Sequence, residues 1–136
     1  MNIVHLYSGS DGKSHFRDIE VPLGEGIFGF ELPGVEGVQI RDVPDHHSSD
    51  FHTAPRRMLI LQLMGSGETD CGDGEVRVFG PGEYMLADDR TGRGHKSREV
   101  SGPRQQMFIY ISEDVEVSES GFAGPSNRTQ GVQHAQ

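Results

Sequence analysis

The stretch DFHTAPRRMLILQLMGSGE, residues 50–68, contains a strand whose two faces differ in character. Side chains alternate across a β-strand, so a strand that runs unbroken from residue 52 divides this stretch into two sets. One face carries His52, Ala54, Arg56, Met58, Ile60 and Gln62, and the other carries Arg57, Leu59, Leu61 and Leu63. The leucine face predicts a hydrophobic core, whereas the opposite face mixes apolar and polar groups. Pro55 leaves the alternation at the near end of the strand open.

Gln62 is the most informative polar residue of the mixed face. A buried amide must find hydrogen-bond partners, so its position indicates a wet or ligand-filled cavity rather than a dry core. The alternative is that Gln62 bonds to the backbone at the rim of a barrel.

Glycine and proline determine the fold class that we expect. Nineteen glycines and seven prolines interrupt every window of ten or more residues with a helical apolar period. The sequence therefore predicts an all-β fold with less than about a tenth of its residues in α-helix. Turns such as GDG at 72–74 and GPG at 80–82, typical of a sandwich or small barrel, separate the expected strands, which are 3–7, 16–21, 37–41, 58–64, 75–79, 83–87 and 106–111.

Length and charge limit the classes of function. The 136 residues suffice for one domain, predicted at 1–117, followed by a polar segment, 118–136, predicted as a flexible C-terminal tail. With 21 acidic and 12 basic residues the net charge is -9, which argues against a nucleic-acid partner. No apolar run reaches the roughly 18 residues of a membrane span and no signal peptide is visible, so we expect no membrane association and a cytoplasmic location. Cys71, without a basic neighbour, is expected to be an inert turn residue.

Three separated motifs carry a resemblance to a known family. They are DGKSHF at 11–16, DFHTAPRRM at 50–58 and GDGEVRVFGPGEYMLADDRTGRGH at 72–95. Together they resemble a subgroup of small single-domain bacterial cupins whose members read approximately DGxSHF, WHxAPRRQ, DGExRxFGPGD and DxxGxGH. The resemblance covers roughly residues 4–111. It implies the cupin double-stranded β-helix, a jelly-roll barrel open at one end and often dimeric, but it implies no particular reaction.

The general cupin pattern supplies metal ligands from HxHxxxE and from a later PxGxxH segment, of which this chain keeps Gly92 and His95 but has Arg90 in place of the proline. When the pattern is anchored on Gly65, His52 and His95 occupy ligand positions, whereas Ala54 and Met58 replace the second histidine and the glutamate. Two imidazoles hold a divalent ion weakly, because catalytic sites normally use three protein ligands. We therefore expect no cofactor. The alternative is one divalent metal ion on His52, His95 and a third ligand drawn from His15, His46, His47, Asp88 and Asp89.

Without a metal, the remaining groups suggest acid–base catalysis. His95 is the expected general base, with Asp89 fixing its tautomer, and His52 is either a second acid or a hydrogen-bonding group at the barrel mouth. Arg57 or Arg56, whichever points inward, is expected to hold a substrate carboxylate or to stabilise an enolate. Their alternative is a structural ion pair with Asp88, Asp89 or Glu99. The predicted catalytic residues are therefore His95, His52, Asp89 and Arg57, and the predicted substrate-binding residues are Arg56, Met58, Gln62 and His15.

The role of His15 comes from the resemblance, which implies an N-terminal segment folded across the barrel mouth. A histidine that caps a sheet edge is the alternative.

The sequence is compatible with three classes of function. The first is a metal-independent lyase, isomerase, dehydratase or cyclase that acts by proton transfer on a small carbonyl or carboxylate compound. The second is a metal-dependent dioxygenase, isomerase or lyase. The third is a non-catalytic module that binds a small molecule. In each case we expect a two-fold homodimer, with residues 3–7 as an edge or exchange strand.

Overall fold

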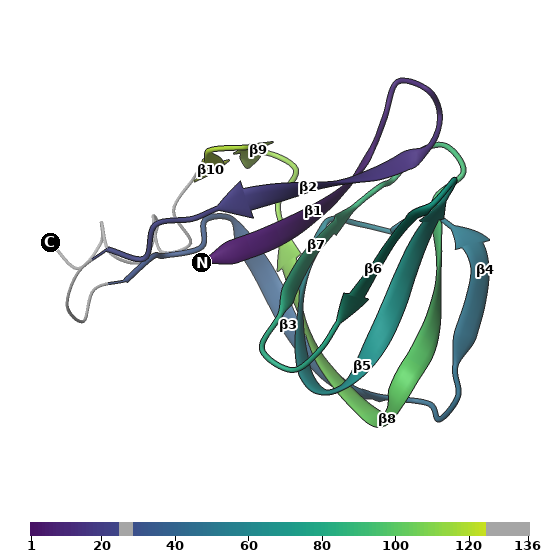
Figure 1. The fold of residues 1–136 in the computed structure, drawn as a ribbon. Coiled ribbons are helices and arrows are strands. Elements are labelled where there is room, and N and C mark those ends of the chain that lie inside the picture. The colour runs from purple at the N-terminus through teal and green to yellow at the C-terminus, as the bar shows by residue number, and fades with distance from the viewer. Residues whose placement is uncertain (25–28, 125–136) are drawn as a thin grey trace, which may run out of the picture.

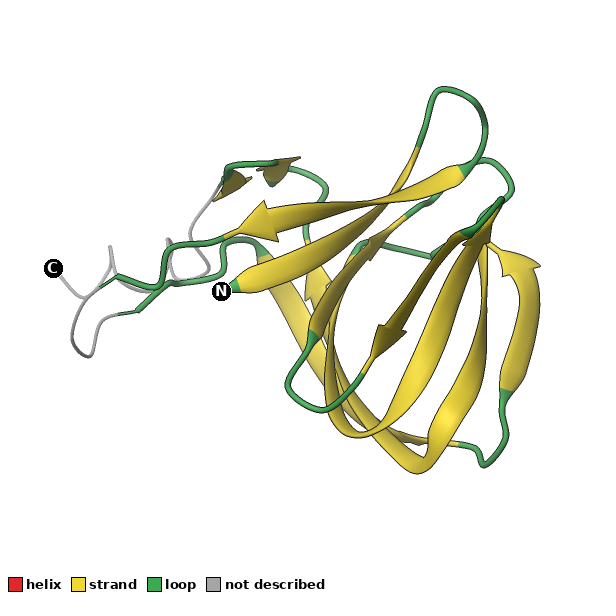
Figure 2. Ribbon diagram, in the orientation of Figure 1, coloured by secondary structure: helices red, strands yellow, loops and turns green. Residues whose placement is uncertain are grey.

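The computed structural model describes residues 1–24 and 29–124, and this part of the chain is all-β (Figure 2). It contains no helix, so none that could cross a membrane, and the all-β prediction is confirmed. Its strands are β1 (Asn2–Ser8), β2 (Ser14–Glu20), β3 (Val35–Val43), β4 (Ser48–His52), β5 (Met58–Gly72), β6 (Glu75–Phe79), β7 (Tyr84–Asp88), β8 (His95–Ile111), β9 (Glu116–Ser118) and β10 (Gly121–Ala123).

All seven predicted strands are present, but two of them are much longer than predicted. β5 continues past Gly65 to Gly72, and β8 begins at His95 rather than at Gln106. β-Bulges between Gln62 and Gly67 carry the β5–β8 pairing through the glycines. Gly65 has φ +71°, and a Cβ atom there would run into the carbonyl oxygens of Ser101 and Pro103. The glycine therefore marks a bend within a strand, not its end.

One mixed sheet contains most of the strands, in the order β2-β1-β7-β5-β8-β3. β6 pairs with the distal half of β5, and β4 pairs with the first half of β8. Only β1 and β7 are parallel among the described pairs. Because β5 and β8 pair along both halves and bend between them, two halves of the sheet curl toward each other (Figure 1). Within the described residues no strand pair closes this sheet into a barrel.

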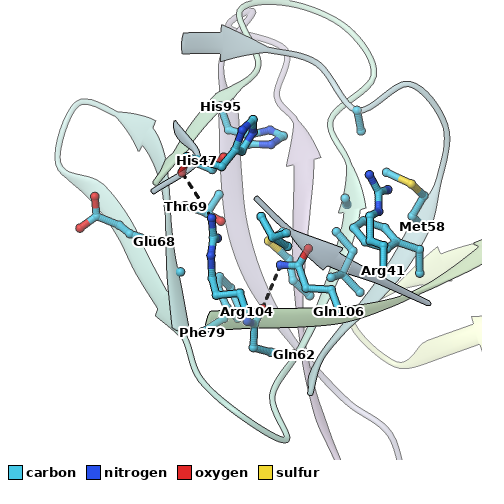
Figure 3. A pocket seen from close by; sticks show the side chains of 18 of the residues that line it. Arg41, His47, Met58, Gln62, Glu68, Thr69, Phe79, His95, Arg104 and Gln106 are labelled. Carbon is cyan, nitrogen blue, oxygen red and sulfur yellow. Dashed lines mark hydrogen bonds between the residues drawn. The ribbon is translucent and has the colours of Figure 1, made fainter. Parts of the chain in front are cut away.

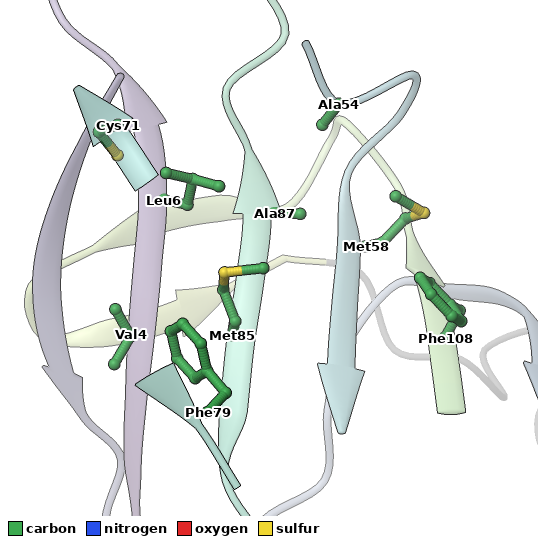
Figure 4. Close-up of a cluster of buried hydrophobic side chains, with 9 residues drawn as sticks. All are labelled: Val4, Leu6, Ala54, Met58, Cys71, Phe79, Met85, Ala87 and Phe108. Carbon is green, nitrogen blue, oxygen red and sulfur yellow. The ribbon is translucent and has the colours of Figure 1, made fainter. Parts of the chain in front are cut away.

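Two apolar clusters lie on opposite faces of the sheet around β7. The outer cluster is fully buried and contains Ile3, Ile19, Val21, Leu59, Leu86, Ile111 and Val115. The inner cluster faces the concave side and contains Val4, Leu6, Ala54, Met58, Cys71, Phe79, Met85, Ala87 and Phe108 (Figure 4). Cys71 lies in β5, so the prediction of a turn residue is wrong, and burial raises the pKa of its thiol to about 12.

The structure differs from two predictions, one for residues 3–7 and one for the start of the C-terminal tail. Residues 3–7 belong to β1, which lies inside the sheet between β2 and β7, so the prediction of an edge strand is wrong within this chain. The homodimer stays a prediction. The predicted start of the tail, residue 118, falls in the β9–β10 hairpin, whose Phe122 packs on the outer cluster. Residues 125–136 of that tail lie outside the described part.

Candidate functional site

A cavity of about 640 Å³ lies between the two halves of the curled sheet (Figure 3). All six residues of the predicted mixed face line it, namely His52, Ala54, Arg56, Met58, Ile60 and Gln62. The predicted alternation is confirmed, although residues 53–57 form a loop between β4 and β5 rather than a continuous strand. The volume is in the range that holds a small organic molecule.

His95 and Asp89 form a buried pair at one end of the cavity. His95 opens β8 and lines the cavity, and its Nδ1 lies 2.6 Å from Oδ2 of Asp89, which follows β7. Because a carboxylate only accepts, the Nδ1–H of His95 donates, and Nε2 keeps its lone pair. Asp89 is fully buried and also accepts a 2.7 Å hydrogen bond from Ser14 Oγ. The predicted contact between Asp89 and His95 is therefore present.

His52 lies beside this pair. The rings of His52 and His95 are 4.6 Å apart between centroids and inclined by 52°. His52 Nδ1–H donates to the carbonyl oxygen of Asp50 at 2.9 Å, which leaves Nε2 to accept or to carry a proton. Gly94 allows this approach, because it has φ +79° and a Cβ atom there would run into the carbonyl oxygen of His52. Two imidazoles thus share one end of the cavity.

The donor set of this site does not fit a three-ligand metal centre. Within the described residues no three histidine, cysteine, aspartate or glutamate side chains lie where they could hold one ion. Met58 lies in the inner apolar cluster, and its thioether is a weak, neutral donor toward a hard divalent ion. Three of the five proposed third ligands are engaged elsewhere, in the pairs His46–Glu99, His15–Glu75 and Asp88–Arg57, and Asp89 accepts a hydrogen bond from His95 itself. His47 lines the cavity, but it completes no such group.

Two alternatives were predicted for Gln62, a place in a cavity and a hydrogen bond to the backbone, and the structure shows both. Gln62 lines the cavity, and its Nε2 donates to the backbone oxygen of Met64 at 2.9 Å. Its Oε1 accepts a 2.9 Å hydrogen bond from Gln106 Nε2, so the buried amide has partners on both atoms. The two amides together form a polar strip on an otherwise apolar wall.

The two neighbouring arginines point in opposite directions. Arg56 lines the cavity, pairs with Glu36 at 3.0 Å and lies over the ring of Tyr110 at 4.1 Å. Arg57 lies outside the cavity, where it is buried, pairs with Asp88 at 3.1 Å and donates to the carbonyl oxygens of Ser112 and Val115. Arg57 thus matches the structural alternative rather than the predicted catalytic role.

His15 also lies away from the cavity. Its Nδ1 is 2.7 Å from Glu75 and its Nε2 is 2.9 Å from Asp11, which links the first hairpin to β6. The hydrogen bond to Asp11, followed by that to Glu75, raises the pKa of His15. This partly exposed cluster has no contact with the cavity that would support the predicted substrate-binding role.

Sequence reasoning missed several residues that line the cavity. They come from β3, β6, β7 and β8 and include Arg41, Phe79, Met85, Arg104, Gln106, Phe108 and Tyr110. A signal was available for some of them. Gln106, Phe108 and Tyr110 alternate with Met107, Ile109 and Ile111 in a predicted strand, so they share one face just as the residues of the 52–62 set do.

No protein-family model matches this chain, and no curated protein matches it either. The case for a function therefore rests on the geometry described above.

Proposed function

We propose that this protein is a small cupin-type enzyme that catalyses proton transfer on a carbonyl- or carboxylate-bearing substrate without a metal ion, as a lyase, isomerase or cyclase. The observation that carries the proposal is the His95–Asp89 pair, 2.6 Å apart, which opens on a cavity with His52 beside it. The cupin jelly roll is part of the proposal. Its support is the sheet curled about β5 and β8 and the convergence of His52, Met58 and His95, all from the motif segments, on one cavity.

His95, hydrogen-bonded to Asp89, can act as a general base. Nε2 of His95 takes a proton from a carbon next to the substrate carbonyl, and the carboxylate of Asp89 stabilises the imidazolium that forms. Burial of Asp89 excludes water from this hydrogen bond and holds the ring in one tautomer. His95 is therefore oriented before substrate arrives.

A second imidazole extends the chemistry beyond simple exchange. After His95 has removed a proton, protonated His52 delivers one to a different atom of the enolate, or to a departing hydroxyl group. The first outcome is an isomerisation and the second an elimination, and both balance in protons. The separation of 4.6 Å between the two rings places both groups within reach of one small substrate.

The walls of the cavity suit a charged intermediate that must be kept from bulk water. Met58, Ile60, Phe79, Met85 and Phe108 supply an apolar lining, in which electrostatic interactions are stronger than in water. A purely binding module would be served by the same lining. The buried His95–Asp89 pair is the feature that favours catalysis over binding.

Hydrogen–deuterium exchange tests the proposal without knowledge of the true substrate. The protein is incubated in D2O with small ketones, 2-oxo acids and 2-hydroxy acids, and loss of the C–H signal next to the carbonyl or carboxylate is followed by proton NMR. We expect exchange with some of these compounds, a decrease of about a hundredfold or more in His95→Asn, and no effect of a chelator.

His46→Asn is the matched control, because His46 is highly exposed and lies outside the cavity lining. Binding without exchange would instead favour the small-molecule-binding module. Exchange that is lost after chelation and restored by one divalent ion would favour the metal-dependent enzyme.

A further inference from the structure

The charges around the cavity differ from those of the chain as a whole. The chain has a net charge of -9, yet the described lining contains three arginines, Arg41, Arg56 and Arg104, against the carboxylates Glu68 and Glu83. Glu68 is held by two hydrogen bonds from Arg98, and Glu83 accepts one from the backbone of Gly80. The lining thus contains one more arginine than carboxylates although the chain as a whole is acidic, and this balance favours an anionic ligand.

Two of these arginines are already engaged. Arg56 pairs with Glu36 at 3.0 Å. Arg104 is buried, donates to the backbone oxygen of His47 at 3.3 Å and lies 3.8 Å from Glu99. Their guanidinium groups therefore serve the protein itself, at least in part.

Arg41 differs from both. Within the described residues its guanidinium makes no hydrogen bond or ion pair, and its only aromatic contact places it 3.7 Å from the centre of the Phe108 ring. Phe108 is buried in the inner apolar cluster, and the guanidinium carbon of exposed Arg41 lies over its ring at the cavity wall. The N–H groups of the Arg41 guanidinium are left to bind an oxyanion.

We propose that Arg41 is the anion-binding residue of this cavity and that its ligand is a small organic monocarboxylate with an apolar body. As a statement about the substrate, this inference rests on the proposed function. The carboxylate binds Arg41, and the body lies on the apolar wall formed by Met58, Ile60 and Phe108. Figure 3 shows Arg41 and His95 on different sides of the cavity, so the acidic group is bound at a distance from the carbon that loses its proton.

The side-chain amides of Gln62 and Gln106 indicate how many acidic groups the ligand carries. Gln62 and Gln106 hydrogen-bond to each other, and Arg41 is the strand partner of Gln106 across β3 and β8. The second oxygen of a bound carboxylate therefore lies near neutral amide groups rather than near a second unengaged cation. One carboxylate fits this arrangement better than a phosphate or a dicarboxylate, which would need more positive charge.

Binding of matched acid and amide probes tests the inference. Benzoate, cinnamate, 3-phenylpropionate and hexanoate are titrated beside their primary amides, and dissociation constants are obtained from NMR shift changes that include the His95 ring. We expect at least one acid to bind about tenfold more tightly than its amide, and Arg41→Gln to remove that preference. Arg41→Lys should restore part of it, because it keeps the charge but loses the planar stack.

Arg77→Gln is the control, since Arg77 pairs with Asp18 and does not line the cavity. The inference is overturned if no acid binds more tightly than its amide, or if Arg41→Gln keeps the preference. The exchange experiment remains separate from this one. Acid preference that depends on Arg41 in a protein without exchange would overturn the proposed reaction alone, and exchange without acid preference would overturn this inference alone.

Discussion

Asp88 and Asp89 are adjacent in the sequence, and each carries a hydrogen bond to a histidine, yet their surroundings differ. Asp88 binds His5 at 2.9 Å and also pairs with Arg57 and Arg90. Asp89 binds only His95 and Ser14 through Oδ2, and its Oδ1, also buried, has no hydrogen-bond partner among the described residues. Asp88 is paired with two arginines, whereas Asp89 has no arginine partner and is bound by one imidazole and one hydroxyl group.

The two histidines show the consequence. Arg17 Nε donates to Nδ1 of His5 at 3.0 Å, and His5 Nε2–H donates to Asp88, so both ring nitrogens of His5 are occupied. His95 uses only Nδ1 and keeps Nε2 for a substrate. A histidine–aspartate contact is therefore not a site by itself. The difference lies in whether the second nitrogen is free and lines a cavity.

Loss of the Asp88 carboxylate should have the largest effect. Asp88→Asn leaves buried Arg57 without its counter-ion, so we expect the free energy of unfolding to fall by about 3–5 kcal/mol. Urea denaturation followed by circular dichroism measures it. Exchange activity per folded molecule should stay unchanged. A decrease below about 1 kcal/mol would show that the network does not hold the fold.

Loss of the other carboxylate should act on chemistry more than on stability. Asp89→Asn keeps the shape but removes the acceptor that stabilises the His95 imidazolium, so we expect exchange to slow by about a hundredfold. The same NMR assay measures this rate, with Asp88→Asn as the partner variant. Equal losses of activity in the two variants would contradict the division of roles.

Low pH should remove the stabilisation that Asp88 contributes through its pair with Arg57. Burial of Asp88 opposes ionisation, but the hydrogen bonds from His5 and Arg57 outweigh it and lower the pKa of this carboxyl. Its stabilisation is therefore complete above the unfolded value of about 3.9 and is lost as the pH falls through the lower folded value. The stability difference between the wild type and Asp88→Asn should shrink below about pH 4. A difference that stays constant down to pH 2.5 would contradict this.

The smallest effect is expected at His15, a third and more exposed histidine–carboxylate cluster. Its pKa is raised, so its stabilisation is present below the unfolded value of about 6.5 and is lost as the pH rises through the higher folded value. His15→Asn should lower the free energy of unfolding by only a few tenths of a kcal/mol at pH 6, because solvent screens the ion pairs. The loss should be smaller at pH 8, where His15 carries less positive charge. Urea titrations at the two pH values compare them. A larger cost at pH 8 would reverse the sign of this assignment.

Local chemistry was sufficient to predict much of the fold. Glycine and proline spacing predicted an all-β chain, and alternation predicted which face of residues 52–62 lines the cavity, because both depend on backbone geometry within a few residues. The same local reasoning ended one strand before Gly65 and began another only at Gln106. It could not include the partner strand, whose bulges allow β5 and β8 to continue.

The sequence by itself determined the fold class, the mixed face of the 52–62 segment and the candidate pair of His95 and Asp89, which are six positions apart in the chain. Only the tertiary structure decided which charged groups share a cavity. It placed Arg41 and Arg56 in the lining and buried Arg57 against Asp88. It also held the partly exposed His15 between Asp11 and Glu75. The physical reason is that strand pairing joins residues 26 to 76 positions apart, so the partners of each charge depend on the curl of the whole sheet.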